Sequence, residues 1–227
     1  MIVLVPARGG SKRVVGKNGR ELGGRPLYEW SIRIGKELGI ESWLSTDREE
    51  WGKEAERLGA GWIRRPAEIS GDRIGDLEVV EHALEVIGGD VDLVVYLRPT
   101  TPFREIEILR GALAFMEDER WTSLRSVEEM GESAYKCFER DKEGRLIPVL
   151  YWDSRGDYEY HDMTDTPNQE VEKTYRANGY IDIMRADLIK QGELWGRRKY
   201  GYITPGVVEI DTEGDLEYAE WRANELA

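Results

Sequence analysis

Hydrophobic positions along the first half of the chain form two alternating patterns. Short continuous apolar runs, typical of strands buried on both faces of a parallel sheet, occur at residues 2–5, 42–46, 61–63 and 92–97. Between and after them, apolar residues recur with the helical period at residues 26–38, 48–58, 77–88 and 105–117. Strands that alternate with helices predict an α/β fold with a doubly wound, mostly parallel sheet.

The middle of the chain has a different pattern. Strand-like segments are expected at residues 122–128, 134–139 and 145–150, with a turn at Asp141-Lys142-Glu143-Gly144, which predicts an antiparallel ribbon. Residues 151–170 are polar, irregular and too long for an idle loop. We therefore expect a single domain over residues 1–227 with a protruding arm or lid at about 130–175.

The last part of the chain returns to strand and helix. One strand is expected at residues 180–184, and another is expected to end at Glu209-Ile210-Asp211-Thr212. Asp211-Thr212 would cap a final helix over about 213–225, as Asp47 would cap the helix at 48–58.

The loop after the first strand concentrates positive charge among glycines. Its glycines are Gly9, Gly10, Gly16 and Gly19, and its cations are Arg8, Lys12, Arg13, Lys17 and Arg20. Glycine lets the backbone approach a ligand and turn its N–H groups toward it, and the cations neutralise negative charge. We therefore predict a polyphosphate cradle; the alternative is a surface loop with solvated cations.

Spacing separates this loop from two common phosphate-binding motifs. A Walker A loop requires Ser or Thr after Gly-Lys, and Asn18 follows Gly16-Lys17 here. The dinucleotide fingerprint Gly-x-Gly-x-x-Gly is also not present at this turn.

Three polar segments follow predicted parallel strands. They are the basic loop, Ser45-Thr46-Asp47 and Arg98-Pro99-Thr100-Thr101-Pro102. Because ligands of doubly wound sheets bind outside the carboxyl ends of the strands, we expect these segments to line one cleft.

Composition limits the kinds of partner. The net charge of −13 argues against general nucleic-acid binding, which needs a broad basic surface. No stretch approaches the roughly 20 apolar residues of a membrane span, so we expect no membrane-spanning segment, and we expect no signal peptide before the first strand. The single cysteine, Cys137, cannot form an internal disulfide, so a reducing, cytoplasmic location is expected.

The basic loop resembles a known signature. Residues Pro6 to Asn18 match Pro-Ala-Arg-x-x-Ser-Lys-x-x-x-x-Lys-Asn, the loop of the CMP-sialate synthetase (acylneuraminate cytidylyltransferase) family, whose members activate acidic sugars. Further similar segments follow in the same order: Arg65-Pro66-Ala67-Glu68, Leu97-Arg98-Pro99-Thr100-Thr101-Pro102-Phe103-Arg104, Arg176-Ala177-Asn178-Gly179 and Glu209-Ile210-Asp211-Thr212-Glu213.

The resemblance implies a Rossmann-like nucleotidyltransferase fold, a homodimer formed through the arm, and a requirement for Mg²⁺. The anomeric hydroxyl of the sugar would attack the α-phosphate of CTP, and pyrophosphate would leave. The implied catalytic residues are Arg8, Lys12, Lys17 and Asp211. The implied nucleotide-binding residues are Ala7, Arg8, Gly9, Gly10, Ser11, Lys12, Lys17, Asn18, Arg65 and Asp76.

A metal site is expected near the end of the chain. Carboxylates at positions i and i+2 of a strand point to the same side, so Glu209 and Asp211 could bind one Mg²⁺ together. The assignment rests largely on the resemblance, in which Asp usually stands at the position of Glu209. The alternative role of Asp211 is the helix cap already described.

The positions implied for the sugar are Arg98, Thr100, Asn168, Arg176, Asn178 and Asp182. Three of them depart from the family: Arg98 stands in place of Gln, Asn168 in place of Arg and Asp182 in place of Tyr. We therefore expect an acidic sugar other than sialic acid, such as another 3-deoxy-2-ulosonic acid. Arg98 would bind a carboxylate or phosphate, or would form a structural ion pair with Asp182.

The position implied for the nucleobase also departs from the family pattern. Asp76 replaces a small hydroxyl residue, and its carboxylate could accept from the amino group of cytosine, accept from guanine, or cap the following helix. CTP is preferred over GTP. A sugar 1-phosphate acceptor that yields an NDP-sugar, and a non-catalytic nucleotide-binding regulator, are the alternative functions. His161, within 151–170, is an open candidate for substrate contact.

Overall fold

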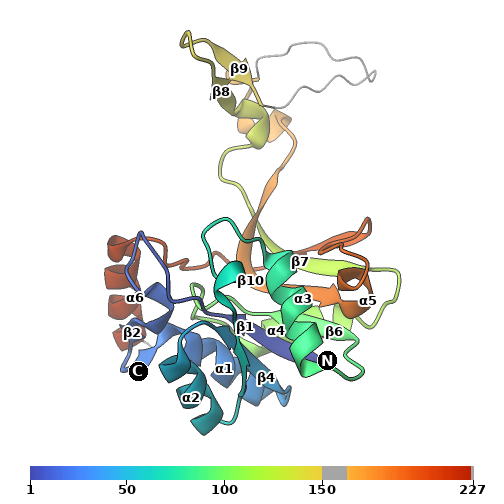
Figure 1. The fold of residues 1–227 in the computed structure, drawn as a ribbon. Helices are drawn as coiled ribbons and strands as arrows, with labels where there is room; N and C mark the ends of the chain where they lie inside the picture. Colours follow the sequence, from blue (N-terminus) through green and yellow to red (C-terminus); the bar gives the residue numbers. More distant parts are fainter. Residues whose placement is uncertain (150–162, 226–227) are drawn as a thin grey trace. The chain divides into compact units, whose positions relative to one another are not determined.

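The computed structural model describes residues 1–149 and 163–225. The chain forms two units, Met1–Ser126 with Asn178–Ala227, and Val127–Ala177. A seven-stranded sheet in the order β11-β7-β10-β6-β1-β4-β5 organises the first unit (Figure 1). Its strands are β1 (Ile2–Pro6), β4 (Ser42–Thr46), β5 (Gly61–Arg64), β6 (Leu93–Tyr96), β7 (Ser123–Glu129), β10 (Tyr175–Arg185) and β11 (Lys199–Ile203).

Four neighbouring strands of this sheet are parallel. β6, β1, β4 and β5 pair in parallel register, and β10 pairs antiparallel to β6. The continuous apolar runs from which they were predicted are buried, as in Val3, Leu4 and Val95, each 0% exposed. The α/β, doubly wound and mostly parallel architecture predicted from the sequence is confirmed.

Helices cover both faces of the sheet. One face packs against α1 (Leu27–Leu38), α2 (Glu49–Arg57) and α4 (Ile106–Phe115), and the other against α3 (Asp76–Ile87) and α5 (Ala186–Ile189) (Figure 1). The hydrophobic stripe of each helix supplies these contacts, such as Ile32 and Leu109 on one face and Val80 on the other. A third small core forms where α6 (Glu213–Glu225) packs on the hairpin of β2 (Glu21–Leu22) and β3 (Arg25–Pro26).

The strand order creates a switch point beside β1. From β1 the chain passes to β4 on one side and later to β6 on the other. The loops after β1 and β6 therefore leave the sheet in different directions, and such a point is where doubly wound sheets bind ligands.

One of the two expected helix caps is present. At the start of α6, Thr212 Oγ1 accepts from the N–H of Asp215, and the Asp215 carboxylate accepts from the N–H of Thr212, so Thr212 of the predicted pair Asp211-Thr212 caps the helix. The prediction that Asp47 caps α2 is wrong, because its carboxylate instead accepts the N–H of Gly9 at 2.7 Å.

The second unit contains the predicted antiparallel ribbon. β8 (Phe138–Arg140) pairs with β9 (Leu146–Pro148). Asp141 Oδ1 accepts from the N–H groups of Glu143 and Arg145 in the turn between them. The prediction of a strand throughout 134–139 is wrong, because Ala134–Lys136 forms a 3-10 helix capped by the Ser133 hydroxyl. Residues 150–162 of the expected arm or lid, which include His161, lie outside the described residues.

Short 3-10 helices complete the described chain, at Lys17–Gly19, Ala67–Ile69 and Asn168–Glu170. No helix within residues 1–149 and 163–225 is both long and apolar enough to cross a membrane.

Candidate functional site

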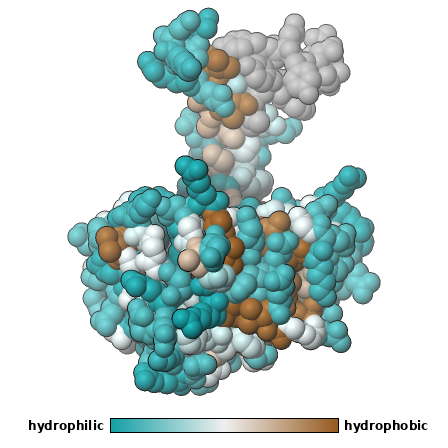
Figure 2. Space-filling model, viewed as in Figure 1, coloured by the Kyte–Doolittle hydropathy of each residue, from teal (hydrophilic) through white to brown (hydrophobic). Residues whose placement is uncertain are grey.

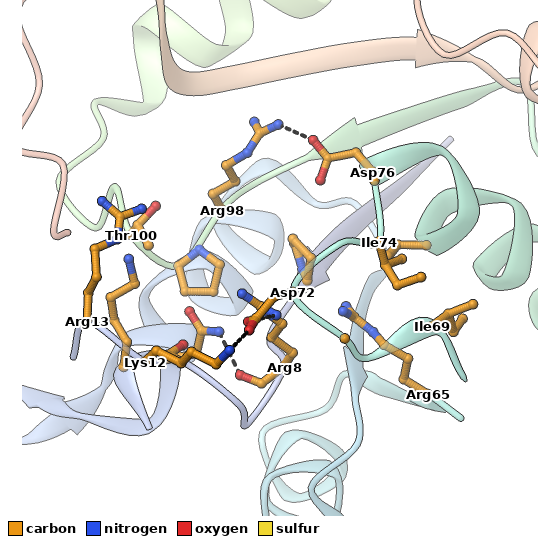
Figure 3. A pocket seen from close by; sticks show the side chains of 18 of the residues that line it. Arg8, Lys12, Arg13, Arg65, Ile69, Asp72, Ile74, Asp76, Arg98 and Thr100 are labelled. Atoms are coloured by element: carbon orange, nitrogen blue, oxygen red, sulfur yellow. Dashed lines mark hydrogen bonds and ion pairs between the residues drawn. The ribbon is translucent and has the colours of Figure 1, made fainter. Parts of the chain in front are cut away.

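A cavity of about 260 Å³ opens at the carboxyl ends of the parallel strands. Residues of the loop after β1, of the segment 69–76 and of the segment after β6 line it, and Arg65 contributes from the end of β5 (Figure 3). The convergence of the basic loop and the segment after β6, predicted from the carboxyl ends of the strands, is therefore present. Ser45-Thr46-Asp47, expected to line the same cleft, is not among the residues that line the cavity; Ser45 instead accepts from Arg65, and Asp47 accepts from the N–H of Gly9.

The loop after β1 is held by bonds to its own backbone and to the next strand. The N–H of Ala7 donates to Ser45 O at 2.9 Å, and the Asn18 side chain donates to Arg8 O at 2.9 Å. Val14 is 0% exposed and anchors the middle of the loop. Gly16 has φ +63, a left-handed conformation that glycine adopts without strain, and it lets the chain turn into Lys17. The cations thus stand on a defined loop.

Two of the loop cations meet an aspartate that sequence analysis did not find. Arg8 Nη1 donates to Asp72 Oδ1 at 2.7 Å, and Lys12 pairs with the other oxygen of the same carboxylate (Figure 3). The hydrogen bonds from Lys12 and then Arg8 lower the pKa of Asp72. One carboxylate held by two cations marks an anion-binding position.

A third loop cation, Lys17, contacts the segment that precedes α6. Lys17 Nζ donates to Asp211 Oδ1 at 2.7 Å and to Ile210 O at 2.8 Å, and Arg13 lies 3.1 Å from Asp211 Oδ2. The hydrogen bond from Lys17 lowers the pKa of Asp211, so this carboxylate is ionised at neutral pH. Lys17 and Asp211, predicted to be catalytic residues, are therefore in direct contact.

This contact predicts a pH dependence of stability. A carboxylate whose pKa is lower in the folded than in the unfolded state stabilises the fold above its ordinary value of 3.8, and this contribution disappears as the pH falls through the lowered value. We expect the free energies of unfolding of wild type and Asp211→Asn to differ by a constant amount from pH 5 to 7. Below pH 3.8 this difference should shrink toward zero. A difference that grows toward low pH would contradict the pairing.

The segment before α6 does not form the predicted strand. Pro205 and Gly206 follow β11, and residues 204–211 lie in no strand. Ile210 instead donates its N–H to Thr100 O at 2.8 Å, which places this segment beside the loop after β6. The strand-based argument that Glu209 and Asp211 share one face is therefore wrong, and their joint binding of a metal stays a prediction.

Asp211 could bind Mg²⁺ only together with ligands from outside the described residues. The described residues contain no cluster of three or more His, Cys, Asp or Glu side chains that would hold a metal alone. Mg²⁺ is commonly bound through one or two carboxylates, with substrate phosphates and water as the other ligands. An ionised Asp211 beside the basic loop fits this kind of site.

The other end of the cavity has a different character. Ile69 and Ile74 line it together with the guanidinium of Arg65 (Figure 3). Arg65 is 5% exposed and donates to Ser45 Oγ at 3.1 Å and to Ser45 O at 2.9 Å. Burial lowers the pKa of Arg65. This end therefore offers apolar surface with one fixed guanidinium.

Asp76 and Arg98 form the upper wall of the cavity as drawn in Figure 3. Asp76 Oδ1 accepts from the hydroxyl of Tyr96 at 2.8 Å, and Asp76 Oδ2 accepts from Arg98 Nη2 at 2.7 Å. Arg98 Nη1 donates to Asp182, which is 1% exposed. The ion pair between Arg98 and Asp182 that the sequence offered as an alternative is thus present.

Charge is balanced within this network. Burial lowers the pKa of Arg98, but Asp182 and Asp76 raise it by more, so the net shift is upward. Arg125 lies 3.4 Å from Asp182 Oδ1, and its guanidinium stacks 4.3 Å from the centre of the Trp195 ring. Both terminal nitrogens of Arg98 are occupied by carboxylates of the protein.

The remaining predicted sugar positions lie in different places. Thr100 lines the cavity, and Asn178 is 3% exposed and donates to Thr204 Oγ1 at 2.8 Å. Asn168 and Arg176 belong to the second unit, where they pair with Lys136 and Glu128. Their contact with a sugar stays a prediction.

Among the predicted nucleotide-binding residues, some backbone N–H groups already donate hydrogen bonds to other residues of the protein. The N–H groups of Ala7 and Gly9 are bonded to Ser45 O and Asp47, whereas Ser11 lines the cavity. Gly10 has open space where a side chain would begin. Sequence analysis missed Asp72 and Tyr96; the only signal for Asp72 was an acidic residue between two glycines, Gly71 and Gly75.

Comparison with known proteins agrees with this geometry. The family model for cytidylyltransferase matches residues 2–189. The chain is 27% identical over 226 residues to the N-acylneuraminate cytidylyltransferase of Escherichia coli, covering 96% of this chain and 51% of that protein. It is 31% identical over 165 residues to the CMP-N,N'-diacetyllegionaminic acid synthase of Legionella pneumophila, covering 67% of this chain and 68% of that protein.

A solved structure with the same fold is a CMP:2-keto-3-deoxy-manno-octonic acid synthetase complexed with CTP. The two chains superpose with a TM-score of 0.71 at 15% identity, covering 100% of this chain and 99% of the other. The chain spans about half the length of several curated relatives that it matches. With its Rossmann-like nucleotidyltransferase fold and a family match over most of its length, this chain belongs to the cytidylyltransferase family.

Proposed function

We propose that this protein transfers CMP from CTP to the anomeric hydroxyl of an acidic sugar and releases pyrophosphate. The observation that carries the proposal is the polarity of the cavity. Arg8 and Lys12 stand at one end, and the apolar surface with Arg65 lies at the other; Lys17, of the same loop as Arg8 and Lys12, also lines the cavity. A nucleoside triphosphate has the same polarity, with charge at one end and a flat base at the other.

The loop cations supply what this reaction needs most. Phosphoryl-type transfer depends on positioning and on neutralising charge that develops on the leaving group. In our proposal the β- and γ-phosphates replace the Asp72 carboxylate on Arg8 and Lys12, where an anion is already held. Lys17 then donates to the departing pyrophosphate.

We propose that Asp211 is a ligand of the Mg²⁺ ion. Its ionised carboxylate, together with Glu209 and phosphate oxygens, would hold Mg²⁺, which neutralises charge on the triphosphate when bound. The lowered pKa of Asp211 keeps it available as an oxygen ligand at neutral pH.

An acidic acceptor is supported by the names of the relatives. Curated relatives include enzymes named for N-acylneuraminate, for N,N'-diacetyllegionaminic acid and for pseudaminic acid. The pseudaminic acid cytidylyltransferase of Campylobacter jejuni is 27% identical over 231 residues, which cover 96% of this chain and 94% of that protein. The identity of the acid is left to experiment, because Arg98 and Asp182 depart from the sialate pattern.

Pyrophosphate release from CTP in the presence of a panel of acidic sugars tests the proposal. We expect release with at least one 3-deoxy-2-ulosonic acid and a product that carries one phosphate. Release with a sugar 1-phosphate alone, and a product with two phosphates, would contradict the proposal.

We also propose that the second unit forms a homodimer contact. Its hairpin buries little, and Leu146, Ile147 and Val149 are 59%, 38% and 44% exposed. Figure 2 shows hydrophobic surface on this unit. Exposed apolar residues on a small unit favour association with a second copy. Sedimentation should give a dimer that Ile147→Asp converts to monomer; a monomeric wild type would contradict the proposal.

A further inference from the structure

We propose that Asp72 is an internal competitor for the phosphates of the ligand. Its carboxylate occupies the cations Arg8 and Lys12, so that CTP and pyrophosphate each have to displace it and each bind more weakly by the same factor. The inference rests on the proposed function, because it concerns the phosphate end of the same cavity. Asp72 thereby controls how tightly the substrate and the product are held.

The carboxylate of Asp72 lies where the phosphates are expected. Arg8 Nη1 donates to Asp72 Oδ1 at 2.7 Å, and the ammonium of Lys12 pairs with Oδ2 (Figure 3). Within residues 1–149 and 163–225, no other carboxylate pairs with either cation. All three side chains line the cavity, at the end to which the proposed function assigns the β- and γ-phosphates. The hydrogen bonds from Lys12 and then Arg8 lower the pKa of Asp72, which keeps the carboxylate charged at neutral pH.

A carboxylate and a phosphate group cannot both hold these cations at full strength. Each takes hydrogen bonds from the same guanidinium and ammonium groups, and two neighbouring anions repel each other. The apparent affinity for a phosphate ligand is therefore reduced by the fraction of molecules in which the cations have lost the carboxylate. Every ligand that needs Arg8 and Lys12 is weakened by this one factor, and a ligand that does not need them is not.

The segment that carries Asp72, residues 67–74, has few other ties. The N–H groups of Ile69 and Ser70 donate only locally, to Pro66 O and Ala67 O. In the part of the chain that the structure describes, Asp72 is the only side chain of this segment that forms an ion pair. A second cavity, of about 560 Å³, also borders the segment at Ala67 and Ser70. The segment can therefore withdraw when a phosphate displaces the carboxylate.

The strength of the competition follows from exposure to solvent. The side chains of Arg8, Asp72 and Lys12 are 31%, 37% and 82% exposed, so water and salt screen both pairs. An exposed ion pair corresponds to a factor of about 1.5 to 5 in an equilibrium constant, and two pairs together to about 2- to 25-fold. A polyphosphate, which carries several charges, can overcome a competitor of this strength.

The competition acts on the product as well as on the substrate. When pyrophosphate leaves, the carboxylate of Asp72 returns to Arg8 and Lys12 and neutralises them. Pyrophosphate is therefore held less tightly than it would be by uncompensated cations. We expect that loss of this carboxylate strengthens product inhibition by pyrophosphate.

The test measures binding of pyrophosphate, CTP and CMP to the whole protein by calorimetry, with Mg²⁺ and without an acceptor sugar. Asp72→Asn should bind pyrophosphate and CTP about 2- to 25-fold more tightly than wild type, by the same factor for both. CMP has no β- or γ-phosphate, so its affinity should not change. In turnover assays, pyrophosphate should inhibit Asp72→Asn at a correspondingly lower concentration.

Two further variants separate competition from a general change in charge. Asp47→Asn is the matched control, because it removes a negative charge beside the same loop, while its amide oxygen can still accept from the N–H of Gly9. Asp47 pairs with neither Arg8 nor Lys12, so this change should tighten pyrophosphate binding less than Asp72→Asn does. Asp72→Glu keeps a carboxylate on a longer side chain and should return the affinity toward the wild-type value.

The outcomes distinguish this inference from the proposed function. Unchanged or weaker binding of pyrophosphate and CTP by Asp72→Asn would overturn the competition. An equal gain in Asp47→Asn, or an equal gain for CMP, would reduce the effect to overall charge and would overturn it as well. All these results leave the proposed function in place. Binding of neither pyrophosphate nor CTP by wild type and by Asp72→Asn would overturn the proposed function together with the role of Asp72.

Discussion

Lys17→Ala is expected to lower kcat by a factor of about 10²–10³, the typical loss when one preorganised donor to a developing negative charge is removed. Lys17 is the best-fixed cation of the loop: its side chain is 13% exposed, and it donates to both Ile210 O and Asp211. Its ammonium therefore needs little reorganisation before it stabilises the departing pyrophosphate. Steady-state pyrophosphate release measures the effect.

Lys12→Ala provides the comparison within the same loop. The side chain of Lys12 is 82% exposed, so its charge is screened by solvent and its removal should act less on kcat and more on the KM for CTP. Wild-type turnover in Lys17→Ala would remove this lysine from the reaction. A larger loss of kcat in Lys12→Ala than in Lys17→Ala would contradict the larger effect on turnover that we assign to Lys17.

Asp182→Ala is expected to destabilise the fold by about 3–5 kcal/mol, the usual cost of removing one partner from a buried ion pair. Asp182 is 1% exposed and faces both Arg98 and Arg125. Without Asp182, the guanidinium groups of Arg98 and Arg125 lose the buried carboxylate that compensates their charge. Urea or thermal unfolding monitored by circular dichroism measures the loss.

Asp118→Ala is the matched control for this effect. Asp118 also pairs with an arginine, but the side chain of its partner Arg120 is 77% exposed. Exposed pairs contribute at most about 1 kcal/mol. An equal loss of unfolding free energy in Asp182→Ala and Asp118→Ala would show that the buried pairs of Asp182 stabilise the fold no more than an exposed pair does.

The sheet and its helices were predictable because their signals are local. A continuous apolar run such as Leu93–Tyr96 has to be buried on both sides, and the apolar repeat in Leu27–Leu38 has to face the sheet. The approximate position of the cavity followed from the strand order, since parallel carboxyl ends share an edge. These inferences need no knowledge of which side chains meet.

The partners of the charged residues were not predictable in the same way. Asp72 meets Arg8 and Lys12 only because the segment before α3 folds over the loop after β1. Asp47 looked like a helix cap, yet the N–H of Gly9 competes for its carboxylate. Such contacts depend on tertiary packing, which overrides the local preference.

The segment around Asp211 illustrates the same limit. The alternation of Glu209, Ile210 and Asp211 resembles a strand, and Ile210 is indeed 0% exposed. The segment belongs to no strand of the seven-stranded sheet; the N–H of Ile210 donates to Thr100 O, and its carbonyl oxygen accepts from Lys17. The resemblance to a known family placed Asp211 near the phosphate loop; the strand argument did not.

The structure of the protein crystallised with CTP and Mg²⁺ tests the central claim most directly. We expect the β- and γ-phosphates on Arg8, Lys12 and Lys17, with the Asp72 carboxylate displaced and the cytosine beside Arg65 and Asp76. A nucleotide bound at another place, with the loop after β1 free of phosphate, would contradict the proposed reaction.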